Sequence, residues 1–288
     1  MINLNEDTIT GAVIQRNAQA KDARLRELMV NLVQHLHAFA RETQLTEEEW
    51  QQGIQFLTRV GQMCDENRQE FILLSDTLGL STLVMALNHR KPAGCTEATV
   101  FGPFYVHGAP ELPLGADIAN GAKGAPCYVS GTVRGDDGRI VANAEIQVWQ
   151  ADEDGFYDVQ YTGKDQLAAR AVLRSDADGN YHFRSILAEP YPIPHDGPVG
   201  DMLEALNRHP WRPAHLHFLI RAEGHQSLTT HVFRKGDKYL ESDAVFGVRS
   251  TLVADWVRHE AGTAPDGSRT DQPFYVLHFD FVLARAGA

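Results

Sequence analysis

Two histidines separated by one residue carry the strongest chemical signal in this sequence. His215 and His217 lie in the segment Trp211-Arg-Pro-Ala-His-Leu-His-Phe-Leu-Ile-Arg221, part of which predicts a strand. Side chains two apart on a strand point to the same face, so both imidazoles could reach a single metal ion. Imidazole binds zinc, copper, iron and nickel, so the spacing selects no metal. Two partly buried histidines satisfied by hydrogen bonds would give the same pattern.

Two tyrosines stand out by their context. Tyr157 lies in Asp154-Gly-Phe-Tyr-Asp158, and Tyr191 lies in Glu189-Pro-Tyr-Pro-Ile-Pro194. The alternating prolines restrict the backbone and so the range of positions open to the Tyr191 ring. A phenolate is a hard anionic donor that suits a trivalent cation such as Fe(III), whose charge would lower the phenol pKa from about 10. From spacing alone, each tyrosine could equally be a packed aromatic.

Other metal-binding patterns are weaker. No cysteine pair lies near the histidines, which argues against a sulfur-rich zinc site. A facial triad would need one carboxylate beside the histidine pair, and the candidates are Asp201 and Glu204. Acidic residues that precede a loop usually face solvent.

Composition limits the class of protein. The chain has 288 residues, 43% hydrophobic and 22% charged, which predicts a large buried core and argues against global disorder. A net charge of -12 makes nucleic acid and anionic membranes poor partners. The three cysteines, Cys64, Cys95 and Cys127, form no C-x-x-C pair, which suits a reducing compartment. With no signal-peptide pattern and no apolar run of membrane length, we expect a cytoplasmic protein.

The first ninety residues predict helices. An amphipathic stripe begins at residue 25, Thr46 with Glu49 fits a capping box, a third helix is expected near residues 68–78, and Ser81 could cap a fourth that ends before Pro92. The stripe consists of Leu28, Met29, Leu32, Val33, Leu36 and Phe39. Glycine and proline recur from about residue 92 to 126, which predicts a long connection.

The rest of the chain has a β pattern. We expect a hairpin of residues 128–134 and 140–149 around a turn at 136–138, and a second of residues 171–174 and 181–186 around a turn at 176–179. Later strands are predicted at 214–221, 228–233 and 274–284. The predicted class is α+β, a helical N-terminal region followed by a β-sandwich.

Several strings resemble the intradiol ring-cleavage dioxygenases, the catechol 1,2-dioxygenase superfamily. An R-P-A-H-x-H string with an upstream Y-x-I-P is highly specific as a pair, and the likeness covers nearly the whole chain. The strings are Thr99-Val-Phe-Gly-Pro-Phe-Tyr105, Gly131-Thr-Val133, Glu145-Ile-Gln-Val-Trp149, Gly155-Phe-Tyr157, Tyr191-Pro-Ile-Pro194, Arg212-Pro-Ala-His-Leu-His217 and Leu228-Thr-Thr230.

The resemblance implies a ferric site. Its ligands would be Tyr157, Tyr191, His215 and His217, with one non-haem Fe(III) per chain. Tyr191 would leave the metal and act as a base, and Arg212 would stabilise negative charge on the ring. The resemblance also implies a helical linker and dimerisation region over residues 1–98, a mostly antiparallel β-sandwich catalytic domain over 99–288, and a homodimer, in some cases with a trapped lipid.

Within the family, the chain is most similar to the hydroxyquinol 1,2-dioxygenases, through residues 99–105, Leu228-Thr-Thr-His231 and residues 241–249. The expected reaction joins O2 to 1,2,4-trihydroxybenzene and gives 3-hydroxy-cis,cis-muconate or maleylacetate. Classical catechol enzymes usually carry Gln at the place of His231. We expect His231 to contact a metal ligand without binding the metal itself. The implied substrate pocket is lined by Leu73, Asp76, Val100, Phe101, Gly102, Pro103, Phe104, Ile193, Pro194, Arg212 and Val245.

Three alternatives stay open. A catechol or chlorocatechol 1,2-dioxygenase would share the iron site. A copper or zinc enzyme would use the two histidines alone. A non-catalytic β-sandwich binding module would bind no metal.

Overall fold

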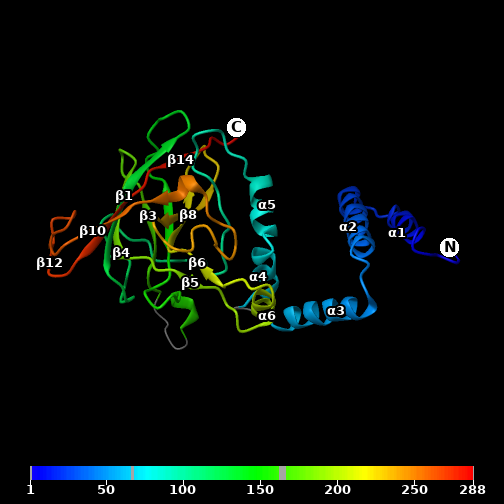
Figure 1. The fold of residues 1–288 in the computed structure, drawn as a ribbon. Coiled ribbons are helices and arrows are strands. Elements are labelled where there is room, and N and C mark those ends of the chain that lie inside the picture. The colour runs from blue at the N-terminus through cyan, green and yellow to red at the C-terminus, as the bar shows by residue number, and fades with distance from the viewer. Residues whose placement is uncertain (1, 66–67, 162–166, 288) are drawn as a thin grey trace. The chain divides into compact units, whose positions relative to one another are not determined.

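The computed structural model describes residues 2–65, 68–161 and 167–287, and the chain divides into two compact units, Met1–Arg59 and Val60–Ala288. The helices can be followed in Figure 1. The first unit contains α1 (Ile9–Asn17), α2 (Ala23–Glu42) and most of α3 (Glu47–Gln62). The predicted capping box is confirmed, because the Thr46 backbone N–H donates to Glu49 Oε2 at 2.9 Å and the Glu49 N–H donates to Thr46 Oγ1 at 3.2 Å.

The second unit carries three more α-helices, α4 (Glu70–Thr77), α5 (Leu80–Asn88) and α6 (Pro198–Ala205). The predicted cap at Ser81 is wrong, because α5 already begins at Leu80 and its N-cap is Gly79. Gly79 has a φ of +74°, a conformation open to glycine, and this lets α5 start directly after α4. The Ser81 hydroxyl instead bonds the Ser75 hydroxyl at 2.9 Å.

No single helix of the described residues is both long and apolar enough to cross a membrane. The α4–α5 pair meets the length and composition test together, but it is bent by 78°.

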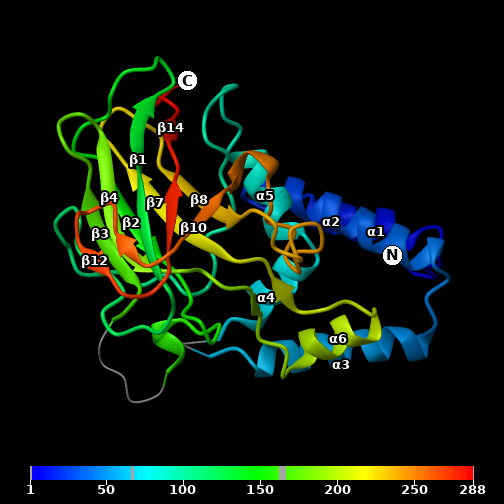
Figure 2. The same ribbon diagram turned by 60° about the vertical axis from the view of Figure 1, so that its left-hand side comes forward.

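Two five-stranded sheets form the body of the second unit, and most of their strands can be followed in Figure 2. In the first, β1 (Pro126–Gly135) pairs antiparallel with β4 and parallel with β13 and β14. The other strands of that sheet are β4 (Asn180–Ile186), β10 (Trp256–His259), β13 (Phe274–His278) and β14 (Phe281–Leu283). The second sheet has the order β3-β2-β7-β8-β9, with β3 (Arg170–Arg174), β2 (Glu145–Trp149), β7 (His215–Arg221), β8 (Leu228–Arg234) and β9 (Val253–Ala254).

Short elements complete the fold. Two small sheets pair β5 (Tyr191–Pro192) with β6 (Trp211–Arg212) and β11 (Gly262–Thr263) with β12 (Arg269–Thr270), and 3-10 helices span Asp158–Gln160 and Ser250–Leu252. The predicted α+β class, helices followed by a β-sandwich, is confirmed.

Both predicted hairpins are wrong in their pairing, although their turns are in the expected places. The first reduces to one bridge between Arg134 and Ile140, and β2 pairs instead with β3 and β7. In the second, β3 and β4 belong to different sheets, so the turn after Arg174 crosses from one layer to the other. The Gly138 and Gly179 N–H groups each close their turn on a carbonyl three residues back. The turn residues predicted where the chain reverses direction, but packing against strands distant in the sequence determined which strands pair.

Strand β7 has the hydrophobic core on one face and the two candidate metal-binding histidines on the other. Its residues Leu216, Phe218 and Ile220 are fully buried in the cluster between the two sheets. Because side chains alternate along a strand, His215 and His217 point to the opposite face. The strand is buried on both faces, so one seven-residue segment supplies part of the hydrophobic core and part of the site.

Candidate metal centre

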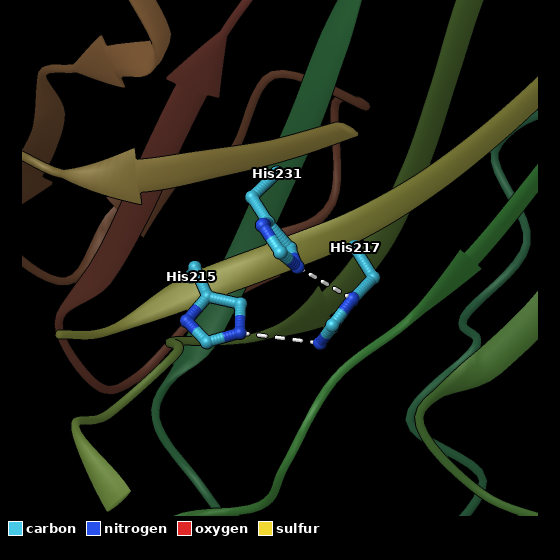
Figure 3. A group of neighbouring side chains, drawn as sticks. All are labelled: His215, His217 and His231. Carbon is cyan, nitrogen blue, oxygen red and sulfur yellow. Dashed lines mark hydrogen bonds between the residues drawn. The ribbon is translucent and has the colours of Figure 1, made fainter. Parts of the chain in front are cut away.

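Three buried histidines meet on the outer face of β7 and β8. His215 and His217 come from β7, and His231 of β8 stands opposite His217 in the antiparallel register. Their nitrogens lie within 4.8 Å of one another, so the group could hold a metal ion. Figure 3 shows the His217 ring joined to each of the other two rings by a dashed line. His215 Nε2 is 3.2 Å from His217 Nε2, and His231 Nε2 is 2.8 Å from His217 Nδ1.

Hydrogen bonds and burial determine the protonation state of these imidazoles. His215 Nδ1 lies 2.7 Å from the Pro213 carbonyl oxygen, which can only accept, so this nitrogen carries the hydrogen and Nε2 keeps its lone pair. Burial lowers the pKa of His215 well below its usual value, and the Arg212 cation lowers it further. Burial also lowers the pKa of His217. Both rings are therefore neutral at pH 7, which is the form that binds a metal.

Two buried phenols join the imidazoles. Tyr157 follows β2 and precedes a 3-10 helix, and its hydroxyl is 2.9 Å from His217 Nε2 and 3.3 Å from the Tyr191 hydroxyl. Tyr191 comes from β5, where it pairs with Arg212 of β6. Burial raises the pKa of Tyr157 well above its usual value, and the neighbouring Tyr191 adds to the rise. Tyr157 therefore stays protonated unless a strong positive charge comes beside it.

Arg212 brings a permanent cation to the same place. Its Nη1 lies 3.4 Å from the Tyr191 hydroxyl and 3.4 Å from His215 Nε2, and its Nε donates to Asp243 Oδ1 at 3.1 Å. Burial alone would lower the pKa of this guanidinium, but Asp243 and Tyr191 raise it above its usual value. The group is always charged and can stabilise a neighbouring anion.

The chemistry of the four donors fits a ferric ion. Two neutral imidazoles and two phenol oxygens converge, joined in a chain by separations of 2.9 to 3.3 Å. Oxygen donors suit hard cations and imidazole suits iron, and ionisation of the phenols would supply negative charge. His231 faces the other nitrogen of the His217 ring, away from the phenols, so its contact supports His217 from behind. Asp201 and Glu204 are exposed on α6, as expected for residues that face solvent.

The segment 100–104 covers one side of these donors. Phe104 stacks on the Tyr157 ring with centroids 4.5 Å apart, and Phe101 lies 5.9 Å from the Trp149 ring. Gly102 approaches most closely, since a Cβ at this position would lie 3.0 Å from His217 Cε1. Val100 is buried and Pro103 is exposed.

The other implied pocket residues come from separate elements. Leu73 and Asp76 are buried on α4, and Val245 is buried after the Asp243 carboxylate. Burial raises the pKa of Asp76, while the nearby Arg212 cation opposes the rise. Directly after Tyr191, Ile193 is buried and Pro194 is partly exposed. The structure therefore places Asp76 within electrostatic range of Arg212 and leaves the pocket assignment as a prediction.

Sequence reasoning missed three contacts that hold the donors. Trp149 stacks on His217 with centroids 4.8 Å apart and planes 15° apart. A buried ion pair joins Arg170 to Asp158, and Arg170 Nη1 also donates to the Phe104 carbonyl at 3.1 Å. The carboxylate of Asp243 holds Arg212, as described above. The β pattern already put Trp149 on a strand, but its position beside β7 depends on a pairing that the sequence does not reveal.

Comparisons with known proteins agree with this geometry. A family model described as "Catechol dioxygenase N terminus" matches residues 22–96, and one described as "Dioxygenase" matches residues 100–285. The 6-chlorohydroxyquinol 1,2-dioxygenase of Cupriavidus pinatubonensis is 59% identical over 98% of this chain and 99% of its own length. The hydroxyquinol 1,2-dioxygenase of Nocardioides simplex is 51% identical over 98% of this chain and 96% of its own.

A solved structure has the same fold along its whole length. The hydroxyquinol 1,2-dioxygenase of Pseudomonas putida DLL-E4 superposes with a TM-score of 0.92 at 43% identity, covering 98% of this chain and 99% of that one. The resemblance inferred from the short strings is thus confirmed across the helical and sandwich regions. The chain belongs to the intradiol dioxygenase family.

Proposed function

We propose that this enzyme cleaves hydroxyquinol, 1,2,4-trihydroxybenzene, between its two ortho hydroxyl-bearing carbons to give 3-hydroxy-cis,cis-muconate or maleylacetate. The observation that carries the proposal is the convergence of two phenols and two neutral imidazoles beside a buried arginine. The hydroxyquinol substrate is supported by relatives of 59% and 51% identity that are named for hydroxyquinols. A chlorinated hydroxyquinol is the second candidate, because the more similar of these two relatives is named for one.

Tyr157, Tyr191, His215 and His217 would hold one non-haem Fe(III). When bound, the ferric ion supplies Lewis acidity and a template on which the diol and O2 meet. The two phenols are not equivalent. Tyr157 is fully buried, its hydroxyl contacts His217, and its ring is stacked on Phe104, so it would remain in place.

Tyr191 is the phenol suited to move a proton. Its hydroxyl lies beside Arg212 Nη1, whose charge stabilises a phenolate at Tyr191 Oη. We expect this oxygen, which would also be a ligand of the ferric ion, to act as a base and accept a proton from a substrate hydroxyl. Arg212 would then stabilise the negative charge that develops on the substrate ring.

Colour and metal content test the ligand set. Ionised Tyr157 and Tyr191 on a ferric ion should give the purified protein a red-brown charge-transfer band, and metal analysis should find iron in preference to copper or zinc. Tyr157→Phe and His217→Ala should each lose iron or activity. Tyr181→Phe is the matched control, since Tyr181 is a buried tyrosine of the sandwich core whose hydroxyl donates to the Phe279 carbonyl. A colourless protein with full iron content would refute the two-tyrosine site.

Substrate choice needs a direct comparison. We expect kcat/KM for hydroxyquinol or 6-chlorohydroxyquinol to exceed that for catechol when the three are measured side by side. A preference for catechol or chlorocatechol would refute the hydroxyquinol assignment and leave the iron site untouched.

We also propose a homodimer that forms through the N-terminal helices, with a lipid bound in the same region. In the first unit Leu28, Leu32, Leu36 and Phe39 of α2 are each at least half exposed, which leaves a row of apolar side chains on one helix. Analytical ultracentrifugation should find a dimer, and Leu32→Glu should weaken it. Lipid extraction with mass spectrometry tests for the bound lipid.

The domain boundary and the location also remain proposals. The N-terminal family model ends at residue 96 and the second model begins at residue 100. These limits support a helical linker over 1–98 and a catalytic domain over 99–288. The contact-based division between Arg59 and Val60 falls inside that linker. Limited proteolysis tests the boundary, and cell fractionation tests the expected cytoplasmic location, for which the three free cysteines are the support.

A further inference from the structure

One buried carboxylate connects the active-site arginine to a neighbouring segment of backbone. Asp243 is 5% exposed, and its two oxygens accept four hydrogen bonds. Two come from Arg212, from Nε at 3.1 Å and from Nη2 at 3.5 Å. The other two come from the backbone N–H groups of Val245 at 3.3 Å and Gly247 at 2.9 Å. The same group therefore fixes the arginine and the segment Asp243–Gly247.

The direction of Arg212 follows from this pairing. A guanidinium is a planar fork, so holding Nε and Nη2 on one carboxylate determines where Nη1 points. Nη1 is the nitrogen 3.4 Å from the Tyr191 hydroxyl. The two charged groups are 3% and 2% exposed at their side chains, so water does not replace Asp243 as a partner.

The segment Asp243–Gly247 is also held from its other side. Arg208 Nη2 donates to the Ala244 carbonyl at 3.0 Å, and Arg208 Nη1 donates to the Thr77 carbonyl at the end of α4 at 2.8 Å. The Thr82 hydroxyl donates to the Val245 carbonyl at 3.1 Å. Val245 is thereby fixed both to the helical elements and, through Asp243, to Arg212.

The backbone of this segment is strained and tightly packed. Phe246 has a φ of +59°, which a bulky non-glycine residue rarely adopts unless surrounding contacts hold it there. A Cβ added at Gly247 would lie 3.1 Å from Arg212 Nη2 and 3.2 Å from Asp243 Oδ2. The segment thus lies directly against the guanidinium, so a shift of one must shift the other.

We propose that Asp243 is a positioning residue that sets both the aim of Arg212 at Tyr191 and the place of Val245 in the substrate pocket. This inference rests on the proposed function, in which Arg212 stabilises charge on the substrate and Val245 lines the pocket. Because one carboxylate serves both groups, its alteration changes rate and substrate discrimination together.

The test is Asp243→Asn, assayed for kcat/KM on hydroxyquinol and on catechol, with iron content and visible spectrum recorded for each preparation. The amide keeps the size of the side chain but loses the charge and one of the two acceptor oxygens. We expect kcat/KM for hydroxyquinol to fall about 10- to 100-fold, which is the scale for misplacing a catalytic group by up to 1 Å. The ratio of kcat/KM between the two substrates should change about 3-fold or more, with iron and colour retained.

Asp280→Asn is the matched control. Asp280 also joins two segments with one carboxylate oxygen, which accepts from the Thr132 N–H and hydroxyl at 2.8 Å, but it lies beside β1 of the other sheet. This variant should keep both the rate and the ratio. Arg208→Gln is the second variant, because it releases the segment without removing a partner of Arg212. It should change the substrate ratio with a smaller loss of rate.

The outcomes distinguish the proposed function from the positioning role of Asp243. A wild-type protein with no colour and no turnover would refute the proposed function. With an active wild type, the positioning role is overturned if Asp243→Asn keeps both rate and ratio, or if it slows both substrates equally. If Asp243→Asn does not fold, an unchanged ratio in Arg208→Gln overturns the role of the segment.

Discussion

Replacing Gly102 by alanine should displace one imidazole of the metal centre by a distance that the structure defines. The added Cβ would lie 3.0 Å from His217 Cε1, whereas carbon atoms in contact are about 3.5–4.0 Å apart. The ring cannot easily give way, because it stacks on Trp149, its Nδ1 bonds His231 at 2.8 Å, and its Nε2 bonds Tyr157 at 2.9 Å. We therefore expect His217 to shift by about 0.5 Å or to lose one of these contacts.

The same substitution also strains the backbone, and this cost can be measured separately. Gly102 has a φ of +79°, where a side chain costs about 1–2 kcal/mol. Gly138 has a φ of +77°, and a Cβ there would meet nothing within 4 Å. Gly138→Ala thus carries the strain without the clash. Both variants should lower Tm by about 2–8 °C, at roughly 2–4 °C per kcal/mol.

Iron content, the visible band and kcat/KM are the deciding measurements. Gly102→Ala should lose about 10- to 100-fold in iron affinity or kcat/KM, the usual scale for disturbing the support of a metal ligand. Gly138→Ala should stay close to wild type in all three. If Gly102→Ala matches Gly138→Ala in iron, colour and turnover, then the close approach to His217 has no role in the site.

Three further predictions follow from contacts around the site. His231→Ala leaves His217 Nδ1 without its partner and should weaken iron binding about 10- to 100-fold in competition with a chelator, while His231→Gln, which keeps a polar partner, should lose less. Asp158→Asn breaks the buried pair with Arg170 and should lower the free energy of unfolding in urea by about 3–5 kcal/mol, and a loss below about 1 kcal/mol would contradict this. In the iron-free protein, burial holds the pKa values of His215, His217 and His231 well below 6.5, so below that pH the unfolded chain binds more protons than the folded one. Thermal unfolding should then show stability falling as pH drops below about 6.5, by up to ~1.4 kcal/mol per pH unit for each histidine, and a flat profile from pH 8 to 5 would refute neutral burial.

Features that depend on residues close together in the chain could be predicted from the sequence. The helical stripe, the capping box at Thr46 and the shared face of His215 and His217 all depend on neighbours within a few residues. The two tyrosines could not be assigned in this way. A buried tyrosine and a ligand tyrosine have the same local pattern, so Tyr157 and Tyr191 entered through the family resemblance, and the structure then brought their hydroxyls to 3.3 Å.

Long-range pairing explains what the sequence did not predict. The turn residues predicted where the chain reverses, yet β2 pairs with β7 some seventy residues later, and this pairing brings Trp149 opposite His217. Asp243 is a second case. Its partner Arg212 lies 31 residues earlier, and the two meet because the segment after residue 242 folds back on β6, where the Ala244 N–H donates to the Trp211 carbonyl. Alternation along one strand gives no information on such contacts.

Strand β7 is buried on both faces, so a substitution in the hydrophobic core can move the histidines of the metal centre. Leu216 and Phe218 fill the core between the sheets, and on the same backbone the alternate residues place His215 and His217 at the metal centre. A core as densely packed as a crystal transmits a change in volume to the strand that carries it. Phe218→Leu should therefore alter the position of the strand and lower iron affinity, although no atom of Phe218 faces the site. The equivalent change at Phe274, a buried residue of β13 in the other sheet that belongs to a separate cluster, should lower stability by a similar amount and leave the iron unaffected. Equal iron loss in both variants would show that general destabilisation, and not the shared strand, connects the core to the metal.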